Sequence, residues 1–286
     1  MANVRGVGEG GTLQDAFREV PMVTKLLVCG TLLMTVVSSF NLYSVENMVF
    51  DMGRTWRNFE VQRLVLPYLY AGSFSFPFAM HLWMLYDFCR RYEANPFNTG
   101  AGGTSADFLW MVLLGMLVCG FVNYLFLEMP ILSEPLLYMI VYVWSRREPD
   151  VPQKIFGLGP IKSIYLPFVY MAIRTIMGGS ISGMILGIVT GHAYYFFYEI
   201  MPEMYPAINL RRFSTPAFCR SAQEYFTGMS VPVQGIPPRA NAARAGFPAA
   251  AAAPQGGAGQ AAAAGGNNFG GSYNWGGSAG RRLGTQ

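Results

Sequence analysis

Long apolar runs separated by short polar stretches fill the first two hundred residues of the chain. The hydrocarbon core of a bilayer is about 30 Å thick, so a helix needs about 20 apolar residues to cross it. Six runs approach that length and predict transmembrane helices at residues 22–40, 64–88, 108–127, 131–144, 164–177 and 181–200. The run at 108–127 is the clearest, because Asn123 is its only strongly polar side chain. We therefore expect an all-α membrane protein built as a six-helix transmembrane bundle.

Basic residues provide an independent test of that number. With six spans, both ends of the chain lie on one side of the membrane, and sixteen of the twenty lysines and arginines lie there too. The opposite side holds only Arg54, Arg57, Arg63 and Arg174. Cytosolic loops are enriched in lysine and arginine, so this asymmetry predicts that both termini are cytosolic. Five or seven spans would place the arginine-bearing tail outside, which fits the rule less well.

The apolar runs divide the chain into four parts. Residues 1–20 form a cytosolic lead, 21–200 the membrane domain, and 201–231 a cytosolic membrane-proximal segment. Residues 232–286 are almost wholly Ala, Gly, Pro, Asn and Gln. Such a composition has too little apolar surface to bury, so we expect this tail to be disordered.

Two of the polar segments are rich in aromatic residues. Residues 41–63 include Tyr43, Phe50, Trp56 and Phe59, which suits an amphipathic element lying in the membrane interface. Residues 205–226 alternate basic and aromatic side chains. That pattern suits either a segment resting on the membrane surface or an ordinary solvated helix.

Composition and charge exclude several classes of function. Only 13% of the residues are charged and 52% are hydrophobic, and the net charge of +4 is spread over many loops. Without a compact basic stripe we expect no nucleic-acid partner. The four cysteines show no CxxC spacing and are predicted to be buried, unpaired thiols. His81 and His192 lack companion carboxylates at helical spacing, so we expect no metal and no cofactor.

Four glycines recur every fourth residue near the last apolar run: Gly179, Gly183, Gly187 and Gly191. Positions i and i+4 share one face of a helix. A flat row of this kind lets a neighbouring helix approach closely, which is how membrane helices pack. We interpret the row as a packing seam, with direct ligand contact as the alternative.

His192 follows this row and raises the question of catalysis. A catalytic histidine needs a nucleophile within hydrogen-bond reach. Ser180 and Ser182 share its run but lie about 18 and 15 Å away along a helix, and no earlier run contains Gly-x-Ser-Gly. We therefore expect no enzymatic activity. An intramembrane serine protease with an unconventional nucleophile is one alternative, and a small-solute transporter using Asn123, His81, Asp87 and Arg174 is another.

Short motifs along the chain carry a resemblance to a known family, the Derlins. They occur at residues 17–25 (FREVPMVTK), 106–110 (ADFLW), 142–145 (YVWS), 165–167 (YLP), 191–196 (GHAYYF) and 214–218 (STPAF). Derlins are rhomboid-like proteins of the endoplasmic reticulum that lack protease activity. The resemblance implies a six-helix rhomboid-like fold with both ends in the cytosol. It also implies work in ER-associated degradation, moving misfolded protein substrates to the cytosol beside a membrane ubiquitin ligase complex.

The resemblance assigns roles to individual residues. His192 maps onto the catalytic histidine of active rhomboids and reads as a vestigial position that packs or binds a polar neighbour. The first loop of the family usually carries Trp–Arg, and here Gln62 and Arg63 stand at those positions. Many Derlins end in a motif that binds the p97 ATPase. The chain has similar residues, with a lengthened gap between the halves: Trp275, Gly276, Arg282, Leu283 and Gly284.

A mechanism follows from this interpretation. Short spans and a half-submerged loop are expected to thin the lipid bilayer locally, and a polar groove between spans 2 and 5 would lower the cost of passing a polar chain through hydrocarbon. The candidate lining residues are Arg63, Ser73, Ser75, His81, Tyr170 and Arg174. We expect the protein to act as a homo- or hetero-oligomer.

Overall fold

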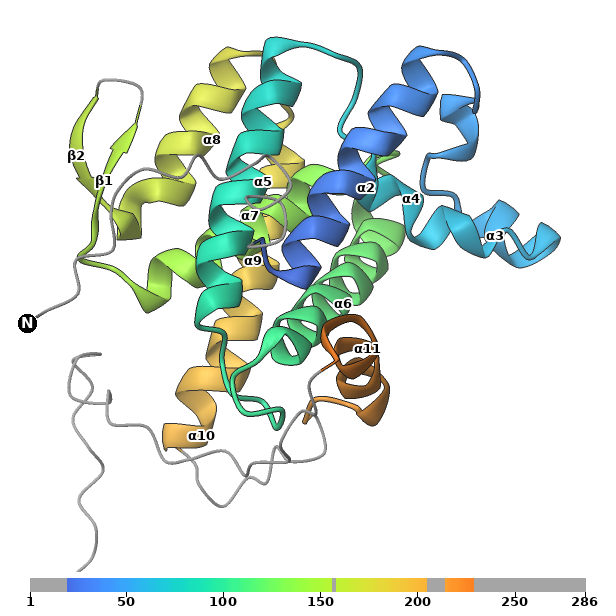
Figure 1. Ribbon diagram of the computed structural model, residues 1–286. Helices are drawn as coiled ribbons and strands as arrows, with labels where there is room; N and C mark the ends of the chain where they lie inside the picture. The colour runs from blue at the N-terminus through green and yellow to red at the C-terminus, as the bar shows by residue number, and fades with distance from the viewer. Residues whose placement is uncertain (1–19, 156–157, 205–213, 229–286) are drawn as a thin grey trace, which may run out of the picture. The chain divides into compact units, whose positions relative to one another are not determined.

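The computed structural model describes residues 20–155, 158–204 and 214–228, and the described chain is mostly helical (Figure 1). Each of the six segments that the apolar pattern selected overlaps at least one helix. The helices of four or more residues are α2 (Met22–Ser39), α3 (Met52–Asn58), α4 (Leu66–Leu69), α5 (Phe76–Ala94), α6 (Ser105–Val122), α7 (Ser133–Arg147), α8 (Leu166–Ile176), α9 (Ile181–Tyr195), α10 (Met201–Met204) and α11 (Ala217–Thr227). The 3₁₀ turns are η1 (Val45–Asn47), η2 (Val61–Leu64) and η4 (Ser163–Tyr165), and the π-helical turns are η3 (Asn123–Leu127) and η5 (Phe196–Ile200).

Within the described residues, two helices are long and apolar enough to cross a membrane, by length and composition. They are α2 and the continuous helix of α6 and η3, Ser105–Leu127, and the shorter apolar helix Ser163–Ile176 follows them. At the end of η3 the Asn123 side chain donates to Met129 O (2.9 Å) and accepts from Met129 N (2.8 Å). Asn123, the only strongly polar side chain of this apolar run, therefore stabilises the turn that follows the helix.

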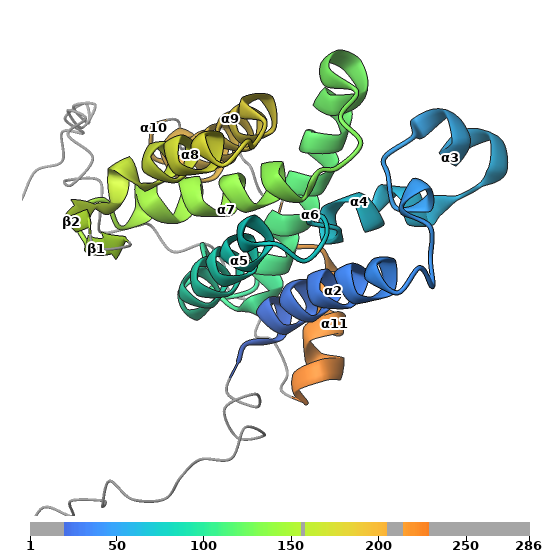
Figure 2. The same cartoon turned by 90° about the horizontal axis from the view of Figure 1, so that it is seen from above.

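Helix α7 is the centre of the bundle. Twelve of its fifteen residues are buried, and α5, α6, α8 and α9 all pack against it (Figure 2). A helix that is apolar on every side is expected to be surrounded by others rather than to face solvent or lipid. The position of α7 decides which side chains of the other helices can meet.

The expectation of one helix over residues 64–88 is wrong. α4 ends at Leu69, and Gly72, with a φ of +94°, lies in the left-handed region in the link that separates α4 from α5. Ser75 then caps the new helix by accepting a hydrogen bond from Phe78 N (3.3 Å), with Pro77 in its first turn. Helix α5 consequently begins at Phe76 and continues to Ala94, six residues beyond the expected end.

The start of α2 is held by a buried carboxylate from the end of α5. Glu93, 5% exposed, accepts hydrogen bonds from Val23 N (2.9 Å), Thr24 N (2.8 Å) and Thr24 Oγ1 (2.7 Å). The first N–H groups of a helix have no intrahelical partner and carry partial positive charge. Glu93 satisfies two of them at once, which fixes α2 against α5.

Glu93→Ala is expected to destabilise the protein by about 3 kcal/mol, because it leaves buried donors of α2 unpaired. Glu148→Ala removes an exposed carboxylate near the end of α7 and is the matched control. The measurement is the thermal unfolding midpoint of each purified variant in digitonin. Equal midpoints for the two variants would contradict the capping role of Glu93.

Between α7 and α8 the chain forms a hairpin that the sequence pattern did not predict. Strand β1 (Pro152–Ile155) pairs antiparallel with β2 (Leu158–Lys162), with Pro152 opposite Lys162 and Ile155 opposite Leu158. Arg91 at the end of α5 donates to Gln153 Oε1 (2.6 Å), so the hairpin is tied to the same end of the bundle as the last turn of α5.

Candidate functional site

Helices α5 and α8 both pack against α7 more extensively than against one another. Their direct contact is aromatic: the rings of Phe88 and Tyr170 meet edge to face with centroids 5.9 Å apart, and Trp144 of α7 lies 5.3 Å from Phe88. This contact joins the later part of α5 to the beginning of α8. Toward the other ends of the two helices, α5 carries His81 and α8 carries Arg174.

Four residues form what we call the polar cluster: His81, Glu134, Tyr138 and Arg174. Arg174 Nη2 lies 2.5 Å from Glu134 Oε1, an ion pair that joins the last turn of α8 to the first turn of α7. Arg174 also lies near enough to His81 of α5 and to the Tyr138 hydroxyl of α7 for its charge to act on both, as the charge of Glu134 does on Tyr138. Three helices therefore contribute charged or polar groups to one place.

The six residues predicted to line a groove separate into two groups. His81 and Arg174 lie in the polar cluster, and Tyr170 lies beside it, one turn before Arg174 on α8. Ser73 and Ser75 are exposed in the link between α4 and α5, and Arg63 lies in a different network. The sequence reasoning did not include Glu134 and Tyr138; the only signal for Glu134 was a carboxylate at the start of an apolar run.

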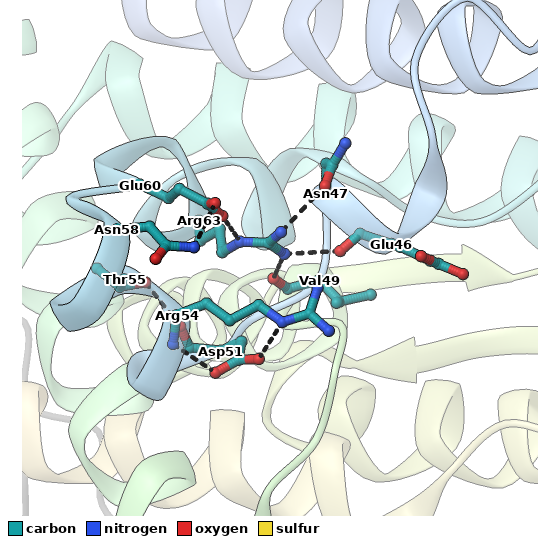
Figure 3. A network of polar contacts seen from close by, with 9 residues as sticks. All are labelled: Glu46, Asn47, Val49, Asp51, Arg54, Thr55, Asn58, Glu60 and Arg63. Carbon is teal, nitrogen blue, oxygen red and sulfur yellow. Dashed lines mark hydrogen bonds and ion pairs between the residues drawn. The ribbon is translucent and has the colours of Figure 1, made fainter.

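Arg63 organises the loop between α2 and α4 (Figure 3). Its side chain is 2% exposed. The guanidinium donates through Nε to Glu60 Oε2, through Nη1 to the carbonyl oxygens of Glu46 (2.6 Å) and Val49 (3.4 Å), and through Nη2 to Asn47 Oδ1 (3.0 Å). Arginine can bind all these acceptors at once because its guanidinium presents five donors in a rigid planar fork. The compact ammonium group of a lysine could not. Gln62, which precedes it, is exposed.

The hydrogen bond from Arg63 holds the pKa of Glu60 below its usual range. A carboxyl whose pKa is lowered by folding stabilises the folded loop above its ordinary pKa. That contribution is lost as the pH falls through the lowered value. The loop is therefore held in its charged, paired form at neutral pH.

Around this network the loop exposes large apolar side chains. Trp56 on α3 is 84% exposed and Phe59 is 86% exposed, with Phe40 and Leu42 at 72% and 75%. The buried hydrogen bonds of Arg63 fix the loop, and large apolar side chains are exposed on it. Such an exposed apolar patch is expected to contact lipid or another protein. The arrangement has the features expected of an amphipathic element in the interface.

His192 lies on α9, where its Nδ1 is 2.8 Å from the hydroxyl of Tyr142, and the two rings meet edge to face at 5.9 Å. The hydroxyl partner is thus a phenol on α7 fifty residues away in the chain. Ser180 precedes α9, and its hydroxyl is 2.8 Å from that of Ser182 in the first turn. Among the described residues, the hydrogen bonds of His192 include no serine hydroxyl.

The four glycines of the predicted row differ in how closely neighbouring atoms approach them. A methyl group at Gly187 would collide with the carbonyl oxygen of Pro135 and lie 2.8 Å from Tyr138 Cβ, and one at Gly191 would lie 3.0 Å from the Met139 carbonyl oxygen. At Gly183 a methyl group would have ordinary contacts of 3.6 Å. Gly179 lies before the start of α9 and does not belong to the row.

A second buried carboxylate ties α11 to the start of α6. Asp107 is 1% exposed and accepts hydrogen bonds from the hydroxyls of Thr99 and Thr215, each at 2.6 Å, and from several backbone N–H groups of residues 99–104. Gln223 of α11 also accepts from Ala106 N (2.7 Å). Cys219 is fully buried beneath this contact, where burial raises the pKa of its thiol to about 11.

Thr215→Val should increase the rate of Cys219 alkylation by maleimide about tenfold, because a lost hydrogen bond to a carboxylate favours detachment of α11. Thr227→Val, which changes an exposed hydroxyl at the end of α11, is the control. Labelling of the Cys219 peptide is followed by mass spectrometry in intact membranes. An unchanged rate in Thr215→Val would show that its hydroxyl does not hold α11 in place.

All four cysteines in the described residues are free thiols. Cys89, Cys119 and Cys219 are buried, as expected, but Cys29 is exposed on α2, so the expectation is wrong for that residue. The apolar pattern alone does not reveal which side of a membrane helix faces its neighbours. The residues predicted to bind p97, Trp275, Gly276, Arg282, Leu283 and Gly284, lie outside the described residues, as do residues 1–19.

Comparison with known proteins gives consistent matches. A model of the Der1-like family matches residues 20–217. The chain is 30% identical over 219 residues to Derlin-2.2 of Arabidopsis thaliana, in a match that covers 73% of this chain and 87% of that relative. It is 28% identical over 219 residues to Derlin-2 of Oryza sativa subsp. japonica (73% and 85% covered) and 29% identical over 191 residues to Derlin-1 of Arabidopsis thaliana (66% and 70% covered). The polar cluster, Arg63 and His192 all lie within the region that the family model matches.

Proposed function

Because this chain belongs to the Der1-like family of multi-pass membrane proteins, we propose that it is a non-catalytic component of ER-associated degradation. It helps to move misfolded proteins from the lumen or the membrane of the endoplasmic reticulum to the cytosol. The family match over residues 20–217 is the observation that carries this proposal. The contact of His192 supports the non-catalytic part, since a serine protease needs a serine hydroxyl within hydrogen-bond reach of its histidine and the partner here is the phenol of Tyr142.

The proposed topology has six spans with both termini in the cytosol. Helices α2, α5, α6, α7, α8 and α9 are the six spans, and the sixteen-to-four distribution of basic residues supports this orientation. Several of these helices are shorter than the 20 residues that a bilayer of ordinary thickness requires. Short spans are accommodated by local thinning, which reduces the thickness of hydrocarbon that a substrate must cross.

The proposed path lies between α5 and α8, over α7. Both helices pack mainly against α7, and the polar cluster provides charged and hydrogen-bonding groups between them. An unsatisfied backbone group costs several kcal/mol in hydrocarbon. Polar side chains at this position lower that cost for a chain that enters from the side.

Partners are proposed from the same family membership. A membrane ubiquitin ligase complex would receive the substrate on the cytosolic side, and the p97 ATPase would bind the C-terminal tail. The protein acts as a homo- or hetero-oligomer in the bilayer. Removal of residues 274–286 should abolish co-purification of p97 from digitonin membranes while leaving the ligase bound.

The direct test is the half-life of a misfolded luminal reporter after protein synthesis is stopped. Cells lacking this protein should degrade the reporter more slowly, and wild-type protein should restore the rate. His192→Ala should restore it equally well, because the proposal gives His192 no catalytic role. Normal degradation without the protein would overturn the proposal, and labelling of wild type but not His192→Ala by a fluorophosphonate would favour a protease instead.

A further inference from the structure

The hydroxyl of Tyr138 has an unusual environment. Tyr138 is 2% exposed, and within the described part of the chain its hydroxyl has no hydrogen-bond partner. A buried hydroxyl without a partner is costly, and phenylalanine would fill the same space without that cost. An orphaned group of this kind needs a reason, and binding of a polar ligand is one.

Its neighbours have unused hydrogen-bonding capacity as well. Glu134 Oε1 is in ionic contact with Arg174 but accepts no aligned hydrogen bond from the described residues. Glu134 and Tyr138 are four residues apart on α7 and so share one face of that helix. One carboxylate acceptor, one phenol donor and one guanidinium with several donors are therefore gathered at the same place.

The balance of charge indicates what this place can bind. Glu134 is negative and Arg174 is positive, so a free anion or a free cation would meet one group of like charge. A neutral dipole that has both a donor and an acceptor can be satisfied by both groups. An amide fits this description, because its N–H can donate to Glu134 while its C=O accepts from Tyr138 or Arg174.

Building on the proposed function, we propose that the polar cluster binds an amide group of a translocating polypeptide. The amide belongs either to the main chain of an unfolded segment or to an Asn or Gln side chain within a membrane span. A regular apolar helix presents neither, because its backbone amides are already paired. The polar cluster would therefore distinguish segments with unsatisfied amides from well-formed membrane helices.

Two reporters separate the two sources of the amide. The first is a single-span protein with a leucine-rich helix, made with either Asn or Leu at its centre and a photocrosslinking amino acid beside that position. The second is a misfolded luminal protein with the crosslinker in an extended segment. Crosslinking of each reporter to the wild-type chain and to Tyr138→Phe is measured in intact membranes, alongside the thermal unfolding midpoint of each variant.

The proposal predicts opposite changes in stability and binding. Tyr138→Phe should keep or raise the unfolding midpoint, because it removes an unpaired buried hydroxyl, yet it should reduce crosslinking about fivefold through the loss of one hydrogen bond. Loss with the Asn span but not the Leu span assigns the side-chain amide, and loss with the luminal reporter assigns the main chain. Tyr124→Phe, at a phenol 53% exposed on η3, should change neither quantity.

Unchanged crosslinking of both reporters in Tyr138→Phe would overturn the proposal. So would equal crosslinking of the Asn and Leu spans together with no loss for the luminal reporter. Reporter half-lives in cells without the protein test the proposed function separately. If those half-lives are lengthened while Tyr138→Phe crosslinks normally, the function stands and the amide site does not.

Discussion

Replacing Gly187 by alanine should destabilise the helical bundle by about 3 kcal/mol or more. The added methyl group would collide with the carbonyl oxygen of Pro135 and crowd Tyr138 Cβ. Neither can move by a change of rotamer, because the first belongs to the backbone of α7 and the second is fixed by it. Relief requires α7 and α9 to separate, and α7 is the helix against which most of the bundle packs.

Gly183→Ala is a matched control in the same helix and one turn away. A methyl group there would have ordinary contacts at 3.6 Å with Met129 and Pro135. Alanine is also more favourable than glycine inside a helix by about 1 kcal/mol. This variant should therefore be as stable as the wild type or slightly more stable. Unfolding midpoints in digitonin and steady-state amounts in cells provide the comparison. Similar losses at both positions would show that helix flexibility, and not close packing, explains the glycines.

The positions of helices were predictable from the sequence to different degrees. The run at 108–127 is apolar throughout, so its hydropathy alone predicted a helix that closely matches α6 and η3. The run at 64–88 is interrupted by prolines and polar residues, and its long helix begins only at Phe76. The difference depends on a positive φ at Gly72 and a cap at Ser75, which are local backbone choices that hydropathy does not encode.

The candidate site shows the same limit more strongly. Polarity and expected depth selected His81, Tyr170 and Arg174, which lie at or beside the polar cluster. The same criteria selected Ser73 and Ser75, which are exposed in a link. Glu134 and Tyr138 were missed because their importance comes from contacts with α8, forty residues away from Glu134 in the chain. Pairing across helices depends on packing that one sequence does not reveal.

Polar side chains near the ends of the apolar segments serve different purposes. Glu93 and Asp107 are buried and accept several hydrogen bonds each, so they hold α2 and α11 in place. Tyr138 is also buried and Glu134 is partly exposed, and both are incompletely paired within the described residues. Fully paired carboxylates are expected to be sensitive to mutation through stability. Incompletely paired groups are expected to be sensitive through binding, and this contrast can be measured.

Arg63→Ala should loosen the loop between α2 and α4 by about 2–3 kcal/mol, because it removes the charged donor of several hydrogen bonds made by a side chain that is 2% exposed. The change leaves the carboxylate of Glu60 without its partner and removes the donors that bind the Glu46 and Val49 carbonyl oxygens. Arg63→Lys should recover little, since an ammonium group cannot reproduce the fork that reaches three directions. Chymotrypsin cleavage beside Trp56 and Phe59, in membranes opened so that the protease reaches the luminal side, measures how often this loop opens.

Arg54→Ala is the control that distinguishes loss of the buried hydrogen-bond network from loss of positive charge. It removes one arginine from the same loop without touching the bonds of Arg63. It is 57% exposed and pairs with Asp51 at 3.3 Å, and exposed ion pairs contribute about 0–1 kcal/mol. Cleavage should therefore accelerate by roughly 30- to 150-fold for Arg63→Ala and by less than about fivefold for Arg54→Ala. If both variants are cleaved at the same rate, the positive charge of the loop matters more than the buried bonds. If neither variant is cleaved faster than the wild type, the loop is held by its apolar contacts with the membrane. Trp56 and Phe59 are then the residues to change.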